Sequence, residues 1–154
     1  MPTRRTLLAA SAGFGAAALG GRTLLRAAEA AGPQPLRIPE LIDARRQGQS
    51  IALTARRGRT AFLPGRPTPT LGYNGAHLGP TLRLHRGDEV EIAVTNALAE
   101  DTAVHWHGLL VPGHLDGGPH QPIRPGATLR PVLPIRQPAA TLLYHSHLHG
   151  RTAE

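Results

Sequence analysis

The sequence contains no cysteine, and this absence excludes more chemistry than any other feature of its composition. A chain without thiols forms no disulfide, uses no catalytic thiolate and offers no thiolate ligand to a metal. Aromatic residues are scarce, and no run of Arg with aromatic residues of an RNA-binding kind is present. The net charge of +7 comes from 17 scattered arginines against 10 acidic residues, which is typical of a solvated surface, and no nucleic-acid partner is expected.

Long helices are not expected either. The 154 residues suffice for one domain with its own core, and 18 Gly and 15 Pro are spread along them. Such a composition favours many short elements joined by turns. An all-β fold is therefore the first expectation.

The first 30 residues have the pattern of a twin-arginine (Tat) export signal. Arg4 and Arg5 precede an apolar run from Leu7 to Leu19, and Ala28-Glu29-Ala30 offers small residues at the spacing that a signal peptidase requires. The apolar run has about 13 residues, well short of the roughly 20 that span a bilayer. We therefore expect cleavage after Ala30, export to the periplasm or otherwise out of the cytoplasm, and no stable membrane anchor.

Residues 31–50 are interpreted as a linker or a wrapping segment, with at most one helical turn after Pro39. From residue 51, apolar residues alternate with Arg or Glu, as half-buried strands require. The alternating residues are Ile51 and Leu53, then Leu82 and Leu84, then Val90, Ile92 and Val94. Turn clusters separate them at 64–70, 74–75, 86–88 and 124–128. This spacing predicts an antiparallel β-sandwich over residues 51–154.

Four of the nine histidines stand in two His-X-His pairs, His105 with His107 and His145 with His147. Side chains alternate between the two faces of a strand, so the members of each pair point the same way. If the two segments approach each other, four imidazoles converge, and neutral imidazole is the commonest nitrogen ligand of copper, zinc and iron. The pairs therefore predict a metal site, while Trp106 between two of them is expected to pack in the core.

The other five histidines are not expected to bind the metal. His149 is interpreted as a residue that supports the site or hydrogen-bonds within a turn. The remaining four are expected at the surface, namely His77, His85, His114 and His120.

Two long segments resemble the copper-binding motifs of multicopper oxidases. They are HWHGLLVPGHLDGGPHQPIRPG at 105–126 and QPAATLLYHSHLHG at 137–150, and LGYNGAHLGPTLRLHRGDEVEIAVTNAL at 71–98 resembles the preceding strands. The likeness runs from about Ile51 to the C-terminus and is greatest to bacterial copper-efflux oxidases and laccase-like enzymes. It implies a cupredoxin-like Greek-key β-sandwich, the N-terminal plastocyanin-like domain of an oxidase, with copper as cofactor.

The resemblance also implies a role for each histidine of the two pairs. His105 would bind the type 2 copper. His107 and His145 would share one ion of the type 3 pair, and His147 would bind the other. Asp116 matches a family acid that supports proton delivery during oxygen reduction. From the residues alone, Asp116 is equally well interpreted as a turn residue ahead of Gly117 and Gly118.

Other parts of such an oxidase are not found in this sequence. The family oxidises cuprous ion or a phenol at a type 1 copper held by Cys and His, and this chain has no Cys. It also ends at HGRTAE, where the first domain of the family would continue. We therefore expect a truncated domain that holds half of the trinuclear cluster and is inactive alone. Reduction of O2 would need the remaining cupredoxin domains or a partner fragment.

A second hypothesis is a non-catalytic periplasmic copper-binding or structural module. Copper-free members of the same superfamily act in cell division or as scaffolds, and this chain is similar to them as well. The retained histidines favour the oxidase, because copper-free relatives typically lose these residues.

Overall fold

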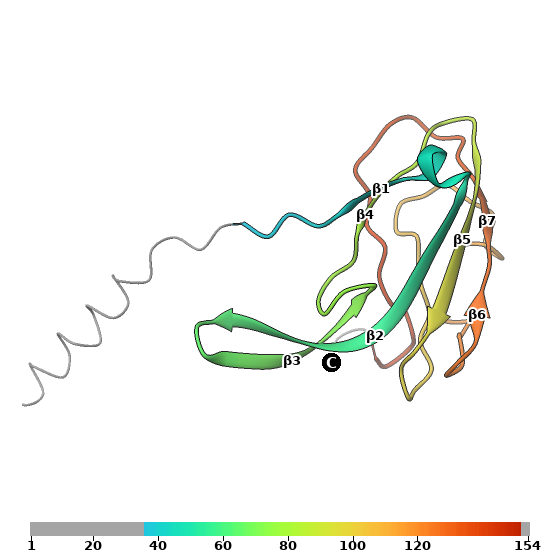
Figure 1. Cartoon of the computed structure of the whole chain (residues 1–154). Helices are drawn as coiled ribbons and strands as arrows, with labels where there is room; N and C mark the ends of the chain where they lie inside the picture. Colours follow the sequence, from blue (N-terminus) through green and yellow to red (C-terminus); the bar gives the residue numbers. More distant parts are fainter. Residues whose placement is uncertain (1–35, 152–154) are drawn as a thin grey trace, which may run out of the picture. The chain divides into compact units, whose positions relative to one another are not determined.

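A computed structural model describes residues 36–151 of the chain. Residues 1–35, which include the predicted export signal, lie outside the described residues, as do residues 152–154. Within the described range the chain forms strands and one short 3-10 helix, η1, but no α-helix (Figure 1). The elements are β1 Leu41–Asp43, η1 Ala44–Gln47, β2 Ser50–Leu63, β3 Arg66–Tyr73, β4 Thr81–Arg83, β5 Glu89–Asn96, β6 Thr128–Leu129 and β7 Val132–Pro134.

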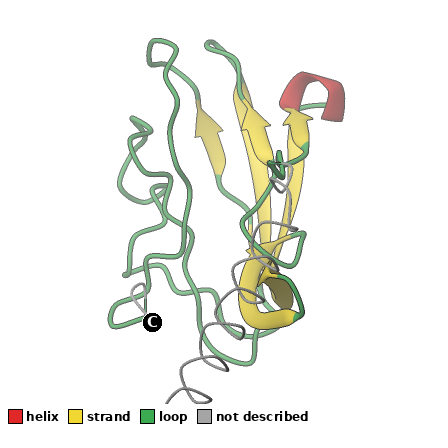
Figure 2. Ribbon diagram, turned by 90° about the vertical axis from the view of Figure 1, so that its left-hand side faces the viewer, coloured by secondary structure: helices red, strands yellow, loops and turns green. Residues whose placement is uncertain are grey.

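The strands form two sheets. The main sheet has the order β3-β2-β5-β6, with β7 also paired to β5, and the smaller sheet consists of β1 and β4. Figure 2 shows the strands of the main sheet on one side and long irregular segments in a layer beside them. No helix in the described part of the chain is long and apolar enough to cross a membrane.

The expectation of a purely antiparallel arrangement is wrong for two of the strand pairs. β2 runs parallel to β5, with Ile51 opposite Ile92, and β1 runs parallel to β4. After the β2–β3 hairpin the chain passes through β4 in the other sheet, and it then returns beside β2 as β5. Such a crossover between sheets places two strands of the same direction next to each other, which a pattern of alternating residues does not reveal.

The segment 31–50, interpreted as a linker or a wrapping segment, contains a strand that was not predicted. β1 pairs with β4, and Asp43 then caps η1 by accepting a hydrogen bond of 3.0 Å from the Arg45 backbone N–H. Ala44 is fully buried in the main core. A strand of three residues is too short to show a period of two, so its sequence carries no recognisable signal.

The core lies between the main sheet and the layer of irregular segments. The alternation predicted for β2 and β5 is confirmed, because Ile51, Leu53, Val90, Ile92 and Val94 are all buried. From the other layer, Val104 and Trp106 join the same cluster. Burial of each large aliphatic side chain contributes roughly 1.5–3 kcal/mol, so the core fixes the irregular layer against the sheet.

Three of the four predicted turn clusters are confirmed, but in the cluster at 64–70 only the first two residues form a turn, and residues 66–70 belong to the edge strand β3, which tolerates proline. Pro64 and Gly65 connect β2 to β3, residues 86–88 precede β5, and residues 124–127 precede β6. Asn74, in the turn after β3, has a left-handed backbone conformation with a φ of 61°. The hydrogen bonds of its side chain explain why asparagine occupies this turn. Its Oδ1 accepts from the Thr54 N–H at 2.7 Å and its Nδ2 donates to the Ala52 carbonyl at 3.0 Å, which ties the end of β3 to β2.

Candidate metal centre

The two His-X-His segments meet through one antiparallel bridge between His105 and His145. The His105 N–H donates to the His145 carbonyl at 2.8 Å, and the His145 N–H donates to the His105 carbonyl at 3.1 Å. Directly opposed residues of an antiparallel pair place their side chains on the same face. The bridge therefore brings the histidines of both segments together, as the sequence predicted.

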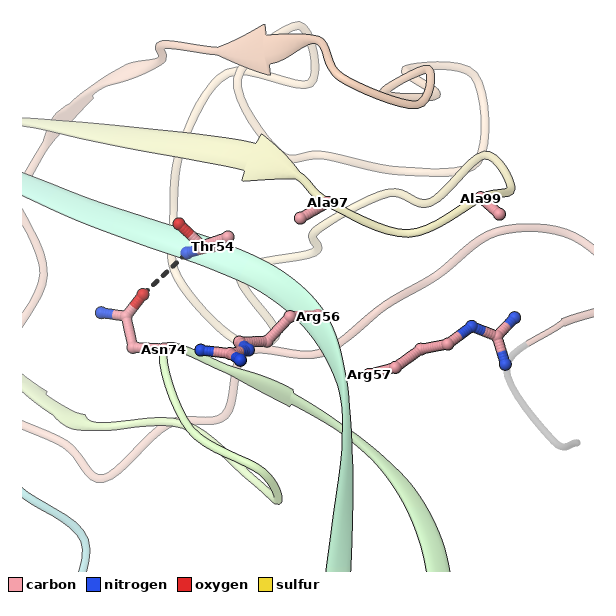
Figure 3. A pocket seen from close by; sticks show the side chains of 6 residues that line it. All are labelled: Thr54, Arg56, Arg57, Asn74, Ala97 and Ala99. Carbon is pink, nitrogen blue, oxygen red and sulfur yellow. Dashed lines mark hydrogen bonds between the residues drawn. The ribbon is translucent and has the colours of Figure 1, made fainter.

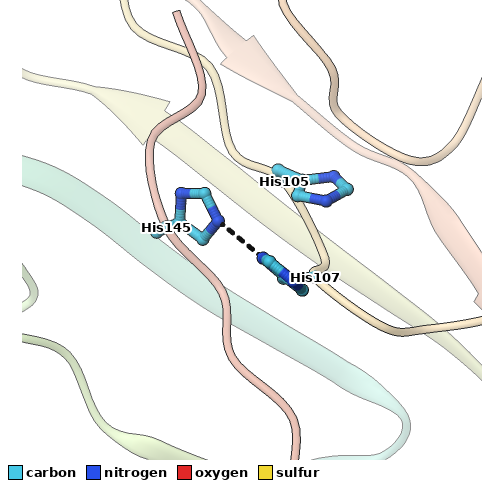
Figure 4. A group of neighbouring side chains, drawn as sticks. All are labelled: His105, His107 and His145. Atoms are coloured by element: carbon cyan, nitrogen blue, oxygen red, sulfur yellow. Dashed lines mark hydrogen bonds between the residues drawn. The ribbon is translucent and has the colours of Figure 1, made fainter. Parts of the chain in front are cut away.

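Three imidazoles converge at this bridge (Figure 4). One ring nitrogen each of His105, His107 and His145 lies within 4.8 Å of the other two. His107 Nδ1 and His145 Nε2 are 3.2 Å apart. His107 is exposed, whereas the other two are half-buried, so the cluster opens to the surface on the His107 side.

His147 lies at the rim of the same cluster. Its ring centroid is 5.1 Å from that of His105 and 5.7 Å from that of His145, and its side chain is exposed. The structure thus gathers all four histidines of the pairs, with three donor nitrogens in mutual reach and the fourth ring beside them.

Backbone carbonyls determine which ring nitrogen carries the proton in two of these histidines. His105 Nδ1 lies 3.0 Å from the Asp116 carbonyl, and His145 Nδ1 lies 2.8 Å from the Ser146 carbonyl. A carbonyl oxygen only accepts, so each Nδ1 must donate its proton. In the neutral rings, Nε2 of His105 and Nε2 of His145 are then unprotonated, which is the form that a metal ion requires, and Nε2 of His145 accepts from His107 Nδ1 at 3.2 Å.

Asp116 touches the site as well as forming a turn. Its carboxylate Oδ1 is 3.2 Å from His105 Nδ1, and its carbonyl accepts from the Trp106 N–H at 3.2 Å. The next residue, Gly117, has a φ of 71°, and a Cβ there would collide with the Val104 carbonyl. Asp116 therefore has the position of a turn residue, and it also contacts the His105 ring.

Trp106 packs in the core, as predicted. It is buried and belongs to the main hydrophobic cluster, and its ring centroid is 6.0 Å from that of Tyr144. Its indole nitrogen is buried without a hydrogen-bond partner among the described residues.

Tyr144, which the sequence analysis did not single out, supports the second pair. Its hydroxyl donates to the Pro80 carbonyl at 2.8 Å, and its ring lies 5.3 Å from that of Tyr73. Burial raises the pKa of both phenols, that of Tyr73 to about 12. The hydroxyl thus anchors Tyr144, the residue just before His145. In the sequence, only the position of Tyr144 directly before a His-X-His pair indicates this role.

The other histidines lie outside the cluster. His77, His114 and His120 are exposed, and His149 lies in the turn that the Arg151 N–H closes onto the Leu148 carbonyl. His85 is half-buried instead of lying freely on the surface, because its Nε2 is 3.2 Å from Asp43 Oδ1.

The environment of Asp43 is ionic and belongs to the fold rather than to the metal centre. Burial acts to raise the pKa of Asp43. Hydrogen bonds from His85 and from the Arg45 N–H, together with the charge of Arg83, outweigh that effect and lower the pKa.

A surface depression away from the histidines does not bring polar side chains together around a common point. It is lined by Thr54, Arg56, Arg57, Asn74, Ala97 and Ala99 (Figure 3). The Asn74 amide is hydrogen-bonded to the backbone of β2, and Figure 3 shows the two arginine side chains pointing in different directions. We assign no ligand to it.

The fold is that of a cupredoxin-type domain, and the histidine cluster on it is a candidate metal site. The sequence profile of the multicopper oxidase family matches residues 54–154, and the chain belongs to this family. A laccase-like multicopper oxidase, CueO from Ochrobactrum sp., has a similar solved structure, with a TM-score of 0.74 and 44% identity over 77% of this chain and 27% of its own. The predicted family and the cupredoxin-like Greek-key β-sandwich are thereby confirmed.

Curated relatives carry two kinds of name. The cell division protein FtsP of Salmonella typhimurium is 45% identical over 152 residues, which cover 99% of this chain and 32% of FtsP. The multicopper oxidase mco of Staphylococcus aureus is 43% identical over 126 residues, which cover 80% of this chain and 28% of that protein. The chain thus spans about a third of the length of the curated relatives that it matches.

Proposed function

We propose that this chain is the copper-binding N-terminal portion of a multicopper oxidase and supplies half of the trinuclear cluster that reduces O2 to water. The observation that carries the proposal is the meeting of His105, His107 and His145 within 4.8 Å. The fixed Nδ1 protons support it, because they leave Nε2 unprotonated on two of the rings. An all-imidazole donor set without a thiolate suits copper bound as type 2 and type 3 ions.

In this proposal, His105 holds the type 2 ion, His107 and His145 share one type 3 ion, and His147 holds the other. Bound copper would supply the one-electron redox chemistry that O2 reduction requires. The chain's own contribution is to orient the rings. The Asp116 carbonyl and carboxylate keep the proton of His105 on Nδ1, and the Ser146 carbonyl does the same for His145.

Asp116 has a further role in the proposal. Its side chain is partly exposed and adjoins a metal-ligand ring, so it can take up protons from solvent and release them at the cluster. Because its backbone also shapes the turn at Gly117, a variant must change only the side chain, as Asp116→Asn does.

The remaining parts of the reaction lie outside this sequence. Oxidation of cuprous ion or a phenol at a type 1 copper, and the other half of the cluster, would come from further cupredoxin domains or a partner fragment. The twin-arginine leader would place the protein in the periplasm, without a stable membrane anchor or a nucleic-acid partner.

Copper titration of double variants tests the proposal. Copper(II) should bind weakly to the chain, because half of the cluster ligands are absent. Replacing His105 and His107 by Ala, or His145 and His147 by Ala, should each remove most of the binding measured by calorimetry. The matched control replaces His77 and His85, which lie outside the cluster beside Phe62 and Asp43, and should leave copper binding unchanged. Equal affinity in all three double variants would contradict a joint site.

A second candidate is a structural module without turnover, and the relatives named as cell division proteins favour it. Such a module would need the sandwich but not the ligands. It predicts that the two histidine double variants retain the function of the full-length protein in cells, whereas a variant with a disrupted core does not. Loss of function on removal of either histidine pair would exclude it.

A further inference from the structure

The β2–β3 hairpin leaves the main sheet halfway along β2. β2 pairs with β5 only from Ser50 to Ala55, and beyond that point its partner is β3 alone. We call residues 56–72 the β2–β3 arm. Figure 1 shows the arm extending away from β5, β6 and β7. At about 3.3 Å per residue, the run from Arg56 to Leu63 makes it about 25 Å long.

The arm is braced along part of its length by the loop that follows it. The Thr70 hydroxyl donates to the Ala76 carbonyl at 2.6 Å, and Gly58 lies so close to the Ala76 backbone that a Cβ would not fit. The Phe62 ring makes an edge contact with His77 at 5.0 Å. A two-stranded ribbon alone is marginally stable in water, so these contacts are what keep the arm extended.

Charge is strongly segregated around the arm. No acidic residue occurs between Asp43 and Asp88, and eight arginines do. Four of them are on the arm itself, at Arg56, Arg57, Arg59 and Arg66. Arg57, at its base, pairs with Glu100 at 2.9 Å. Closer to the tip, the Arg59 guanidinium donates to the Pro67 carbonyl at 3.1 Å, which holds its charge towards the turn.

The tip of the arm is apolar and exposed. Phe62 and Leu63 precede the Pro64-Gly65 turn, and 55% and 61% of their surfaces are exposed. Pro67 and Pro69 lie on β3, the edge strand of the sheet. Proline offers no N–H, so this edge is unsuited to pairing with a further strand. The apex must therefore make contacts through its side chains.

We propose that the β2–β3 arm binds an anionic lipid surface. Phe62 and Leu63 enter the interfacial region, while Arg59 and Arg66 contact the headgroup phosphates. A membrane is favoured over an acidic protein because of the shape of the arm. Stable protein interfaces bury about 800 Å² on each partner, which a two-stranded tip does not offer on one face. A fluid lipid surface, in contrast, surrounds the tip on all sides.

The test places a reporter on the arm of the full chain, in the variant Leu63→Trp. The apolar leader could partition by itself, so total binding to vesicles is not informative, whereas emission from the tip reports on the arm alone. The one natural tryptophan, Trp106, is buried and adds a constant background. With phosphatidylglycerol-containing vesicles, the added emission should shift to the blue and be quenched by brominated lipid. Neutral phosphatidylcholine vesicles should leave it unchanged.

Two charge variants in the same background complete the experiment. Arg59→Gln with Arg66→Gln should raise the lipid concentration for half-maximal shift about 25-fold, at about a fivefold loss for each arginine near the surface. The control, Arg46→Gln with Arg124→Gln, removes the same charge away from the arm and should leave that concentration within about twofold. Absence of a shift, an equal shift with neutral vesicles, or equal losses in both pairs would overturn the proposal. So would the same shift with soluble polyglutamate, which would assign the arm to an acidic polypeptide.

Discussion

The main sheet and the histidine-bearing layer are held together in different ways. β2 pairs with β3 and β5 over long continuous runs. Within the described residues, the segments 102–126 and 137–151 contain no paired strand. One isolated bridge, Thr102 with Ile123, lies within the first segment, and another, His105 with His145, joins the two segments. The sheet is therefore specified by repeated hydrophobic contacts. The geometry of the candidate metal centre depends on a small number of individual hydrogen bonds and close contacts.

The largest effect should come from the sheet. Ile92 is fully buried at the centre of β5, and Ile92→Ala should reduce the free energy of unfolding by about 2–5 kcal/mol because it leaves a cavity. Chemical denaturation measures this loss. The control is Val132→Ala on β7, where 45% of the surface is exposed and the change should stay within about 0.5 kcal/mol. Similar losses at both positions would show that the core does not lie where the structure places it.

Two glycine variants distinguish a turn that positions the candidate metal centre from a turn that does not. Gly117→Ala should cost about 1–3 kcal/mol and weaken copper binding, because a Cβ collides with the Val104 carbonyl one residue before His105. Gly126 has a similar φ of 76° but open space around it, so Gly126→Ala should lose less stability and leave copper affinity unchanged. Calorimetry and denaturation of both variants would check this. Equal copper affinity in the two would mean that the turn does not position the ligand.

A smaller effect is expected at Tyr144. Tyr144→Phe keeps the ring contacts but removes the hydrogen bond to the Pro80 carbonyl, and should cost about 0.5–1.5 kcal/mol. The loss should appear as faster amide hydrogen exchange at His105 and His145, whose bridge it supports. Unchanged exchange there would show that the bridge does not depend on this anchor.

The smallest effect is the pH dependence of the ionic contacts beside β5. The Arg45 guanidinium, bonded to both carboxylate oxygens of Asp88, lowers the pKa of that carboxyl below its ordinary value of 3.8. A lowered folded-state pKa stabilises the protein above the unfolded value, and the benefit is lost as pH falls through the folded value. Asp88→Asn should therefore flatten the fall in stability below about pH 4. An unchanged slope would contradict the pairing.

The sequence predicted some of these features because they repeat and missed others because they do not. The alternation of Val90, Ile92 and Val94 was sufficient to predict β5 and its buried face. It said nothing of the partner strand, so the parallel pairing with β2 was missed. The two His-X-His pairs predicted that the imidazoles would lie together, but the role of Asp116 stayed open because its carbonyl and its carboxylate both contact His105, and the sequence shows neither contact.

The bridge between His105 and His145 also affects the order in which parts of the chain fold. It closes a loop of about 40 residues, and contacts of such separation form late because the entropy of loop closure must first be overcome. β2 and β3, joined by a two-residue turn, are free to pair well before. The imidazoles should therefore come within reach of one another only after the hairpin has formed, so the capacity to retain a metal ion becomes a readout that folding has finished.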